Sequence, residues 1–298
     1  MPFTLNLPYA LCYPFTRLAR RLRVQSDREE NQDLGTYFES QYLSTLDRYH
    51  RHMGELDLKG KTVLDVGSGL GGRSLGWLEL GARNVINIEI NRQTLEAGRA
   101  IFAERYSERA EQIDFRHPEE MTNAGMGEVA ILFDTFEHLV DPSYVLQQIH
   151  GWLRAGGLLW IGSIGWYNHM ASHCASHIPI PWCQVLFSEK AILKTIRTLL
   201  HSPDYTANVW ERRDGLNRWD KVTTLRDRPG EPLNMLSLRQ VRRVLRNSPF
   251  DLLQFRAFGF SGKRKKTARL ASHLAKVPVL QEFFHSYYCA LLSKHSPS

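Results

Sequence analysis

The chain has 298 residues, 43% of them hydrophobic and 23% charged, and it carries a formal net charge of +7. These values predict a globular chain that is long enough to bury a full core. No run approaches the ~18 apolar residues that a membrane-spanning helix requires, so we expect no transmembrane segment. Prolines at positions 2, 8 and 14 interrupt the N-terminal apolar stretch and its basic cluster comes after it, which is not the order of a secretory signal.

Charge and cysteine content bear on the partners and the compartment. Much of the positive charge lies in two short runs, Arg17 to Arg23 and Lys263 to Lys266. Such charge can favour binding to nucleic acid, to an anionic membrane surface or to an acidic substrate. Short basic runs are more often solvated faces, and no aromatic side chains alternate with these, so we expect no nucleic-acid partner.

The four cysteines lie far apart without a C-x-x-C motif, which predicts a reducing, cytoplasmic compartment and no disulfide framework.

Residues 1–58 precede the first strong strand signal, and we interpret them as an N-terminal helical cap. Two leucines four residues apart give the stretch from Thr16 to Val24 an apolar side, which predicts a short amphipathic basic helix. Apolar residues at helical spacing predict a second helix from Glu39 to His52, and Tyr42 on it is a candidate for the substrate pocket. These helices either cover the mouth of a ligand site or pack against the core.

The central motif lies between Val63 and Gly72, where an apolar run containing Asp65 leads through a glycine-rich loop into a helical pattern. This order indicates a buried strand, a tight turn and a helix N-terminus, whose free N–H groups favour anionic or polar ligand groups. The glycines fit both G-x-G-x-x-G and G-x-G-x-G. Asp65 favours a ligand with an amino-acid part, because a pyrophosphate would repel its carboxylate whereas an ammonium would pair with it. A purely structural turn is the alternative.

A second acid closes the next predicted strand. The apolar run from Val85 to Asn91 contains Glu89, which follows Gly67 at roughly the 20-residue spacing of a ribose-binding acid. A carboxylate in this place can accept hydrogen bonds from both hydroxyls of a ribose. The alternative is a strand-end acid that lies in solvent.

Hydrophobic runs and their bounding turn residues predict a continued alternation of helices and strands. The expected elements are a helix from Leu95 to Tyr106, strands at Ile113–Phe115, Val129–Phe133 and Leu158–Ile161, and a helix that opens at Asp141-Pro142 and runs to Leu153.

The segment from about Lys59 to Ile164 resembles a class I S-adenosylmethionine-dependent methyltransferase of the small-molecule type. The resemblance is carried by D-V-G-S-G-L-G, by the acid of I-E-I, and by E-H-L-x-D-P followed by L-R-A-G-G-L-L. It implies an α/β fold, a Rossmann-like three-layer sandwich with a seven-stranded, mostly parallel sheet whose last strand is antiparallel. It also implies S-adenosyl-L-methionine as cofactor, with contacts from Asp65, Gly67, Ser68, Gly69, Gly71, Glu89, Ile90, His117, Glu119, Asp134 and Thr135.

The loop after the third strand departs from the family's pattern. In the family, a stretch resembling G-D-A-E touches the adenine there, whereas this chain has His117-Pro118-Glu119. Either of the two polar side chains or a backbone N–H could meet the adenine amine, so the residue that contacts adenine stays open.

Residues 166–232 do not fit a strand–helix alternation, and we interpret them as an inserted lid. Insertions there lie over the carboxyl ends of the strands, where ligands bind in open α/β sheets. His169, His173 and His177 recur at intervals of four and would share a face of a helix. They could ligate a metal, supply a catalytic base or form a polar pocket wall.

Within this segment we assign no metal site, choose His173 as a candidate base, and place His169 and His177 in the substrate pocket. Trp182 belongs to an aromatic group that either packs the lid onto the core or lines an apolar acceptor pocket. A second candidate base is His138, which follows the fourth strand near the expected position of the methyl group. The alternatives for His138 are cavity lining and helix capping.

Residues 59–165 form the predicted cofactor-binding core. Residues 233–298 return to the same pattern of helices and strands, and we interpret them as the C-terminal part of the core sheet. We expect a helix from Ser237 to Leu245 with Ser237 as its N-cap, a strand from Asp251 to Phe258, a helix from Arg269 to Lys276 and a last strand from Ser286 to Leu292.

The sequence therefore predicts methyl transfer from S-adenosylmethionine to a small, apolar or aromatic acceptor. Oxygen is the preferred atom, in secondary metabolism or quinone-like chemistry. Methylation of carbon or nitrogen, an RNA or protein acceptor, and a non-catalytic cofactor-binding domain that serves a partner are the alternatives. The sequence leaves the oligomeric state open.

Overall fold

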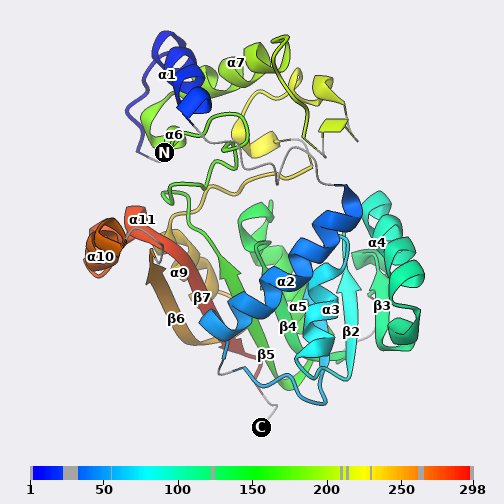
Figure 1. Ribbon diagram of the computed structural model, residues 1–298. Helices are drawn as coiled ribbons and strands as arrows, with labels where there is room; N and C mark the ends of the chain where they lie inside the picture. Colours follow the sequence, from blue (N-terminus) through cyan, green and yellow to red (C-terminus); the bar gives the residue numbers. More distant parts are fainter. Residues whose placement is uncertain are drawn as a thin grey trace.

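The structure, a computed structural model, describes residues 3–22, 33–54, 56–121, 125–208, 211–212, 215–228, 230–260 and 265–295. Arg23, Val24, Lys263 and Arg264 of the predicted basic stretches lie outside these ranges. The chain forms two lobes, one built on a sheet and one made of helices and loops (Figure 1). We call the second the lid lobe; it comprises the described parts of 3–22 and 166–232.

One seven-stranded sheet organises the larger lobe, in the order β3-β2-β1-β4-β5-β7-β6. Neighbours from β3 to β5 pair in parallel, and β7 runs antiparallel between β5 and β6. The predicted sheet with an antiparallel last strand is thus confirmed. Its strands are β1 (Thr62–Val66), β2 (Asn84–Ile88), β3 (Ile113–Arg116), β4 (Gly127–Phe133), β5 (Leu153–Ser163), β6 (Asp251–Gly259) and β7 (His285–Ser293).

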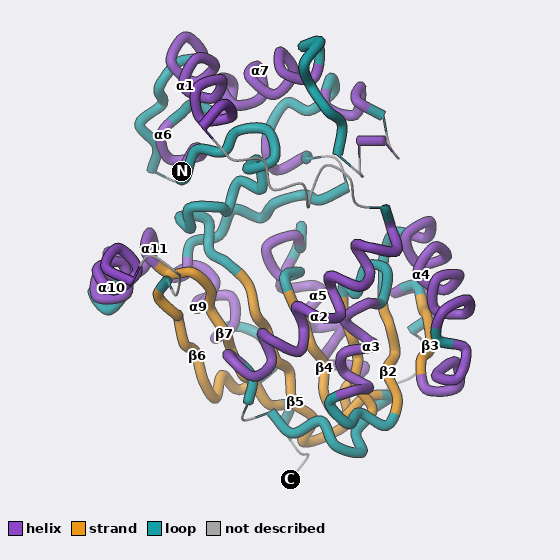
Figure 2. Tube along the Cα trace, in the orientation of Figure 1, coloured by secondary structure: helices purple, strands orange, loops and turns teal. Residues whose placement is uncertain are grey.

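Helices cover both faces of this sheet, as the predicted three-layer architecture requires (Figure 2). Phe38, Trp77 and Phe102 bring three helices onto one face, whereas Leu146 and Leu245 bring two others onto the opposite face. Because both faces are covered, the parallel strands are apolar runs rather than alternating ones. The helices of this lobe are α2 (Leu34–His52), α3 (Gly72–Glu79), α4 (Arg92–Arg105), α5 (Pro142–Trp152), α9 (Leu238–Arg246), α10 (Lys265–Leu274) and α11 (Pro278–Phe284).

Local capping explains why two of the helices begin where the sequence predicts. The Asp141 side chain accepts a hydrogen bond from the Tyr144 N–H, and Pro142 takes the first helical position of α5. Ser237 caps α9, and Gln240 reaches back to the Ser237 N–H to complete a capping box. Both N-cap residues, Asp141 and Ser237, have an extended backbone, so each helix begins directly after its cap.

The lid lobe has an apolar core of its own. α1 (Tyr9–Leu22) packs on α7 (Glu189–Leu200), and Leu7 pairs with Phe187 in a short parallel bridge. Cys12, Ile192 and Trp219 are fully buried in this core. Its described residues also form the short helices α6 (Cys183–Leu186), η4 (Leu216–Trp219) and η5 (Leu225–Asp227).

Two of the sequence interpretations need correction in this region. The N-terminal cap is divided: α2 lies across α3 on the sheet lobe, whereas α1 packs on α7 in the lid lobe. The inserted segment also contains a regular amphipathic helix, α7, which the sequence analysis missed. Ser188 caps this helix. The buried residues Ile192, Ile196 and Leu199 recur every three or four positions, which is the period of an amphipathic helix.

None of the helices in the described part of the chain is both long and apolar enough to cross a membrane. The four cysteines are unpaired and buried.

Candidate active site

The glycine loop between β1 and α3 is held in shape by backbone contacts that side chains would prevent. Gly67 has a φ of +73°, and its N–H donates to the Ile88 carbonyl at 2.8 Å. A Cβ on Gly67 would collide with the Thr135 side chain, which lies against the loop and donates to the Gly67 carbonyl at 3.3 Å. Gly71, at a φ of +86°, is the N-cap of α3. The loop therefore joins the ends of β1, β2 and β4 at one place.

Asp65 lies inside the strand rather than at its open end. It is 1% exposed, and the Ser74 hydroxyl in the first turn of α3 donates to its Oδ2 at 2.7 Å. Burial raises the pKa of Asp65 to about 6, although the Ser74 bond and the Arg73 charge oppose the shift. This carboxyl links β1 to α3, so the predicted ammonium contact would have to share it with Ser74.

Glu89 closes the loop from the neighbouring strand. Its Oε2 accepts from the Gly69 N–H at 2.9 Å and its Oε1 from the Asn91 N–H at 2.8 Å. Both carboxylate oxygens are thus oriented by backbone amides and retain lone pairs for further donors. The exposed Ile90 follows, at 76% exposure, and Ser68 is buried beneath the loop. This arrangement suits a ribose beside an apolar adenine contact.

The residues of the predicted adenine loop are held by one another. His117 Nε2 lies 3.1 Å from the Ile90 carbonyl oxygen, and its Nδ1 lies 3.2 Å from the Arg92 guanidinium. Arg92 also pairs with Glu119 at 2.6 Å. His117 is buried and caps the short helix η2 (Pro118–Glu120). Its side chain therefore supports the backbone next to Ile90, and Glu119 is drawn toward solvent with Arg92.

Asp134, the first residue after β4, has two arginine partners. Arg48 of α2 lies 2.5 Å from its Oδ2 and Arg73 of α3 lies 3.3 Å from the same oxygen. Burial acts to raise the pKa of Asp134, but the two guanidinium groups outweigh it and the pKa is lowered. Its φ of +52° turns the carboxyl toward them. The sequence analysis named Asp134 but missed both arginines, since nothing in α2 signals a partner 86 residues away.

Glu137, His138 and His173 meet where the sheet lobe faces the lid lobe. Ring centroids of His138 and His173 are 4.8 Å apart at an interplanar angle of 82°. His173 Nε2 lies 4.0 Å from Glu137 Oε1, and the Ser163 hydroxyl donates to Glu137 Oε2 at 2.5 Å. Burial raises the pKa of Glu137, and the positive charge that His138 can carry opposes the shift. The two predicted catalytic histidines thus lie together, although 35 residues separate them.

Hydrogen bonding fixes which nitrogen of His138 carries its proton. Nδ1 lies 2.9 Å from the Pro232 carbonyl oxygen, which can only accept, so Nδ1 donates. In the neutral imidazole Nε2 then holds the lone pair. His138 can therefore accept a proton or bind a metal through Nε2.

His173 has a different environment. Its φ is +51°, and Arg228 donates to its carbonyl oxygen at 2.6 Å, which holds the strained loop. Burial, with the nearby His138 and Arg228, lowers the pKa of His173 to about 3. An imidazole with so low a pKa is neutral at physiological pH and gains little by taking a proton, so His173 is a poor general base.

The other lid histidines do not join this cluster, which corrects the expectation of a shared helical face. Residues 166–182 form turns rather than a helix. His177 is buried in the lid core and lies 2.6 Å from Glu211 Oε1. His169 packs instead against Phe260 and Trp182.

Two further pocket candidates also lie elsewhere. Tyr42 packs into the core under α2, beside α3, and burial raises its pKa. The indole N–H of Trp182 donates to the Tyr167 carbonyl at 3.0 Å and lies 3.3 Å from the Phe283 carbonyl of α11, so Trp182 packs the lid lobe against the sheet lobe. Neither side chain lies with Glu137.

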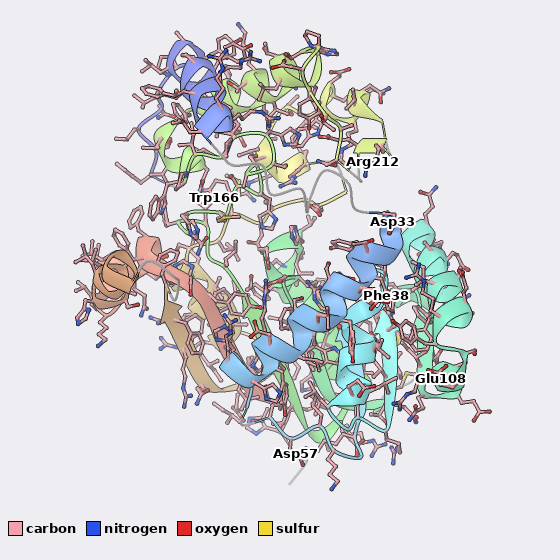
Figure 3. The ribbon with its side chains drawn as sticks, viewed as in Figure 1. Asp33, Phe38, Asp57, Glu108, Trp166 and Arg212 are labelled. Carbon is pink, nitrogen blue, oxygen red and sulfur yellow. The ribbon has the colours of Figure 1, made fainter. Side chains whose placement is uncertain are left out.

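A small, mainly apolar pocket opens beside Glu137. Trp166 lies at the junction of the two lobes, near this place (Figure 3). The pocket's empty space is about 200 Å³ including open solvent, and it leaves room for little more than a water molecule. The pocket as it stands therefore has no room for an organic molecule. Its lining consists of Glu137, Ile164, Trp166, Ala171, Leu233, Asn234, Met235 and Leu236.

Comparisons with known proteins match part of the sheet lobe to methyltransferases. Residues 64–159 match the family model described as a methyltransferase domain. A stretch of 47 residues is 49% identical to the ribosomal protein L11 methyltransferase of Tolumonas auensis and covers 16% of this chain and 16% of that protein. The chain thus matches about a sixth of the length of this curated relative.

Solved structures with a similar fold share little sequence with this chain. A S-adenosylmethionine-dependent methyltransferase from Mesorhizobium loti is 11% identical over 84% of this chain and 100% of that chain, with a TM-score of 0.48. A geranyl diphosphate methyltransferase in complex with GPP and sinefungin is 12% identical over 85% of this chain and 78% of that chain, with a TM-score of 0.49.

Proposed function

We propose that this chain, whose residues 64–159 match a methyltransferase-domain model, transfers the methyl group of S-adenosylmethionine to an oxygen of a small organic acceptor. The observation that carries the proposal is the position of His138. It lies three residues after Thr135, which touches the glycine loop, and its Nε2 holds the lone pair. The cofactor and a proton acceptor are thus brought to the same end of the sheet.

Methyl transfer is an in-line displacement at the carbon bonded to the sulfonium sulfur. The cofactor supplies the reactive methyl group when bound, and the protein supplies orientation and proximity. Gly69 and Glu89 would position the cofactor's ribose, and Ile90 would contact its adenine. His138 Nε2 would take the proton of an acceptor hydroxyl, and the apolar residues around Trp166 would exclude water.

The lining of the pocket supports an apolar or ring-containing acceptor. Ile164, Leu233 and Met235 offer no polar side-chain group, and Glu137 is the one ionisable residue of the lining. Such a wall would bind an aromatic or terpenoid-like molecule better than a charged polymer. The cytoplasmic setting predicted for this biosynthetic reaction is compatible with the four free cysteines.

Two measurements test the proposal. Calorimetry with S-adenosylmethionine should give micromolar-range affinity, roughly −8 kcal/mol, and NAD should give no heat. A panel of phenols, quinols, carboxylic acids, amines, RNA and protein is then offered with methyl-labelled cofactor. Label in a small hydroxyl compound supports the proposal. Heat with NAD alone contradicts the cofactor, and label only in RNA or protein contradicts the small acceptor.

A further inference from the structure

The cluster of Glu137, His138 and His173 has the composition of a metal site. One ligand atom from each residue can be chosen so that all three atoms lie within 4.8 Å of one another. Metal–ligand bonds of about 2.0–2.2 Å to nitrogen and oxygen place tetrahedral ligands roughly 3.4 Å apart. The three side chains therefore need to contract by little more than about 1 Å to surround an ion.

Two of the three side chains, His138 and Glu137, are oriented by a hydrogen bond on the side away from the cluster. His138 Nδ1 donates to the Pro232 carbonyl, so Nε2 presents the lone pair. The Ser163 hydroxyl donates to Glu137 Oε2, so Oε1 is the oxygen that lies toward His173. Outer partners of this kind, a backbone carbonyl on histidine and a donor on carboxylate, fix metal ligands in protein sites.

His173 Nε2 is buried and has no hydrogen-bond partner. The nearest acid oxygen, Glu137 Oε1, is 4.0 Å away, which is too far for a hydrogen bond. An orphaned buried nitrogen costs free energy, and so does the positive φ that His173 adopts. A polar pocket wall would require neither cost, whereas a metal ion would satisfy this nitrogen directly.

We propose that Glu137, His138 and His173 bind a divalent transition-metal ion such as Zn²⁺, and that this ion activates the acceptor hydroxyl. Two imidazole nitrogens and one carboxylate oxygen suit zinc and its neighbours better than magnesium or calcium. Three protein ligands leave a coordination position for the acceptor. The binding site stands on the geometry alone, and its catalytic role rests on the proposed methyl transfer.

The role of the ion replaces that of a histidine base. The ion lowers the pKa of a hydroxyl that it binds, and the proton passes to solvent water. The oxygen keeps the electron pair and forms a new bond to the methyl carbon. The bond between that carbon and sulfur breaks with its electron pair on sulfur, which leaves S-adenosylhomocysteine. His138 Nε2 cannot hold the ion and accept a proton at once, so the two roles exclude each other.

The first experiment measures the metal alone. The full chain is treated with EDTA, dialysed, and titrated with Zn²⁺ and with Co²⁺ in the absence of cofactor. We expect one ion per chain and at least tenfold weaker binding in Glu137→Gln and in His173→Ala. Ser163→Ala should weaken binding about 10- to 100-fold through the lost outer contact. His201→Ala, an exposed histidine at the end of α7, is the matched control and should bind as the wild type does.

Two further measurements, the melting temperature and the Co²⁺ absorption spectrum, distinguish loss of metal binding from failure of a variant to fold. The melting temperature should rise with Zn²⁺ in the wild type and in His201→Ala but not in the cluster variants. The absorption spectrum of wild-type protein with Co²⁺ should be that of a four- or five-coordinate ion with nitrogen ligands. An octahedral, water-like spectrum, or equal binding by the wild type and the cluster variants, overturns the site.

Activity then separates the inference from the proposed function. With a metal role, EDTA abolishes transfer and Zn²⁺ or Mn²⁺ restores it, while S-adenosylmethionine still binds the stripped protein. Full transfer in EDTA leaves the methyltransferase in place and overturns the metal role. Binding of one metal ion per chain without any binding of S-adenosylmethionine would support the metal site and contradict the proposed function.

Discussion

His138 donates its Nδ1 proton to the backbone carbonyl oxygen of Pro232 across 2.9 Å. This bond joins the end of β4 to the segment that returns from the lid lobe. The Asn234 N–H strengthens the same junction by donating to the Glu137 carbonyl oxygen at 2.8 Å. The two bonds therefore fix the orientation of the His138 ring relative to the segment that returns from the lid lobe.

Replacement of His138 should stop catalysis without loss of the cofactor. We expect His138→Gln to lower turnover by about 10²–10⁴, because a proton acceptor or ligand at the reacting oxygen is lost. Affinity for S-adenosylmethionine should change little, since the glycine loop is intact. Single-turnover assays and calorimetry measure the two effects. Turnover within about threefold of the wild type would exclude both roles of this histidine.

Glu89 should control cofactor affinity. We expect Glu89→Ala to weaken binding by roughly 1.5–3 kcal/mol, the range of charge-assisted hydrogen bonds, because it removes an acceptor for the ribose and the Gly69 N–H contact. Glu96→Ala is the matched control, since this acid is exposed on α4 and pairs with the exposed Arg99. Equal affinities in the two variants would show that the ribose lies elsewhere.

Local patterns predicted most of the sheet lobe. The glycine loop, the caps at Asp141 and Ser237 and the apolar strands are all encoded within a few residues, so periodicity and turn chemistry revealed them. The last strand was assigned its antiparallel direction from the family resemblance rather than from any local signal. Local patterns predicted the individual helices and strands, and the methyltransferase resemblance predicted how the strands are arranged in the sheet.

Contacts between distant segments were less accessible. The sequence named His138 and His173 but gave no sign that their rings would meet, and it grouped His173 with His169 and His177 by spacing alone. The positive φ at His173 breaks the helical period on which that grouping depended. Arg48 was missed because its contact with Asp134 joins two segments far apart in sequence and depends on where α2 lies relative to β4.

Arg48 should stabilise the fold through Asp134. We expect Arg48→Met to lower the free energy of unfolding by about 1–3 kcal/mol, since Asp134 would lose the closer of its two arginine partners in a largely buried place. The exposed pair of Arg51 and Asp47 provides the control, and Arg51→Ala should cost below about 0.5 kcal/mol. Urea unfolding measures both; similar losses would mean that the Asp134 contact adds no specific stability.

The lid lobe should open more readily than the sheet lobe. The pocket beside Glu137 is too small for an organic acceptor, so the junction must open transiently. In hydrogen exchange without ligand, amides of α7 should exchange faster than those of β1, and added cofactor and acceptor should slow them. Protection of α7 equal to that of β1 without ligand would contradict a moving lid.

Asp65 should make stability fall as pH rises from about 4 to about 6. Its folded pKa of about 6 lies above the ordinary value of 3.8, so the folded chain binds more protons than the unfolded chain in this window. Asp65→Asn keeps an oxygen that can accept from Ser74 but removes this penalty. Relative to the wild type, the variant should therefore gain stability between pH 4 and pH 7, by up to about 3 kcal/mol.

The exposed Asp57 gives a control of opposite sign, because a bond from the Lys59 N–H lowers its pKa. Asp57→Asn removes a group that stabilises the folded chain above its ordinary pKa and loses this effect as pH falls. Thermal unfolding at pH 4, 5, 6 and 7 measures both variants. A parallel stability curve for Asp65→Asn and the wild type would show that Asp65 ionises normally. Calorimetry on Asp65→Asn tests whether Asp65 also binds the cofactor. Weakened S-adenosylmethionine binding indicates that the Asp65 carboxylate pairs with the cofactor's ammonium group, whereas unchanged binding leaves Asp65 as the link between β1 and Ser74.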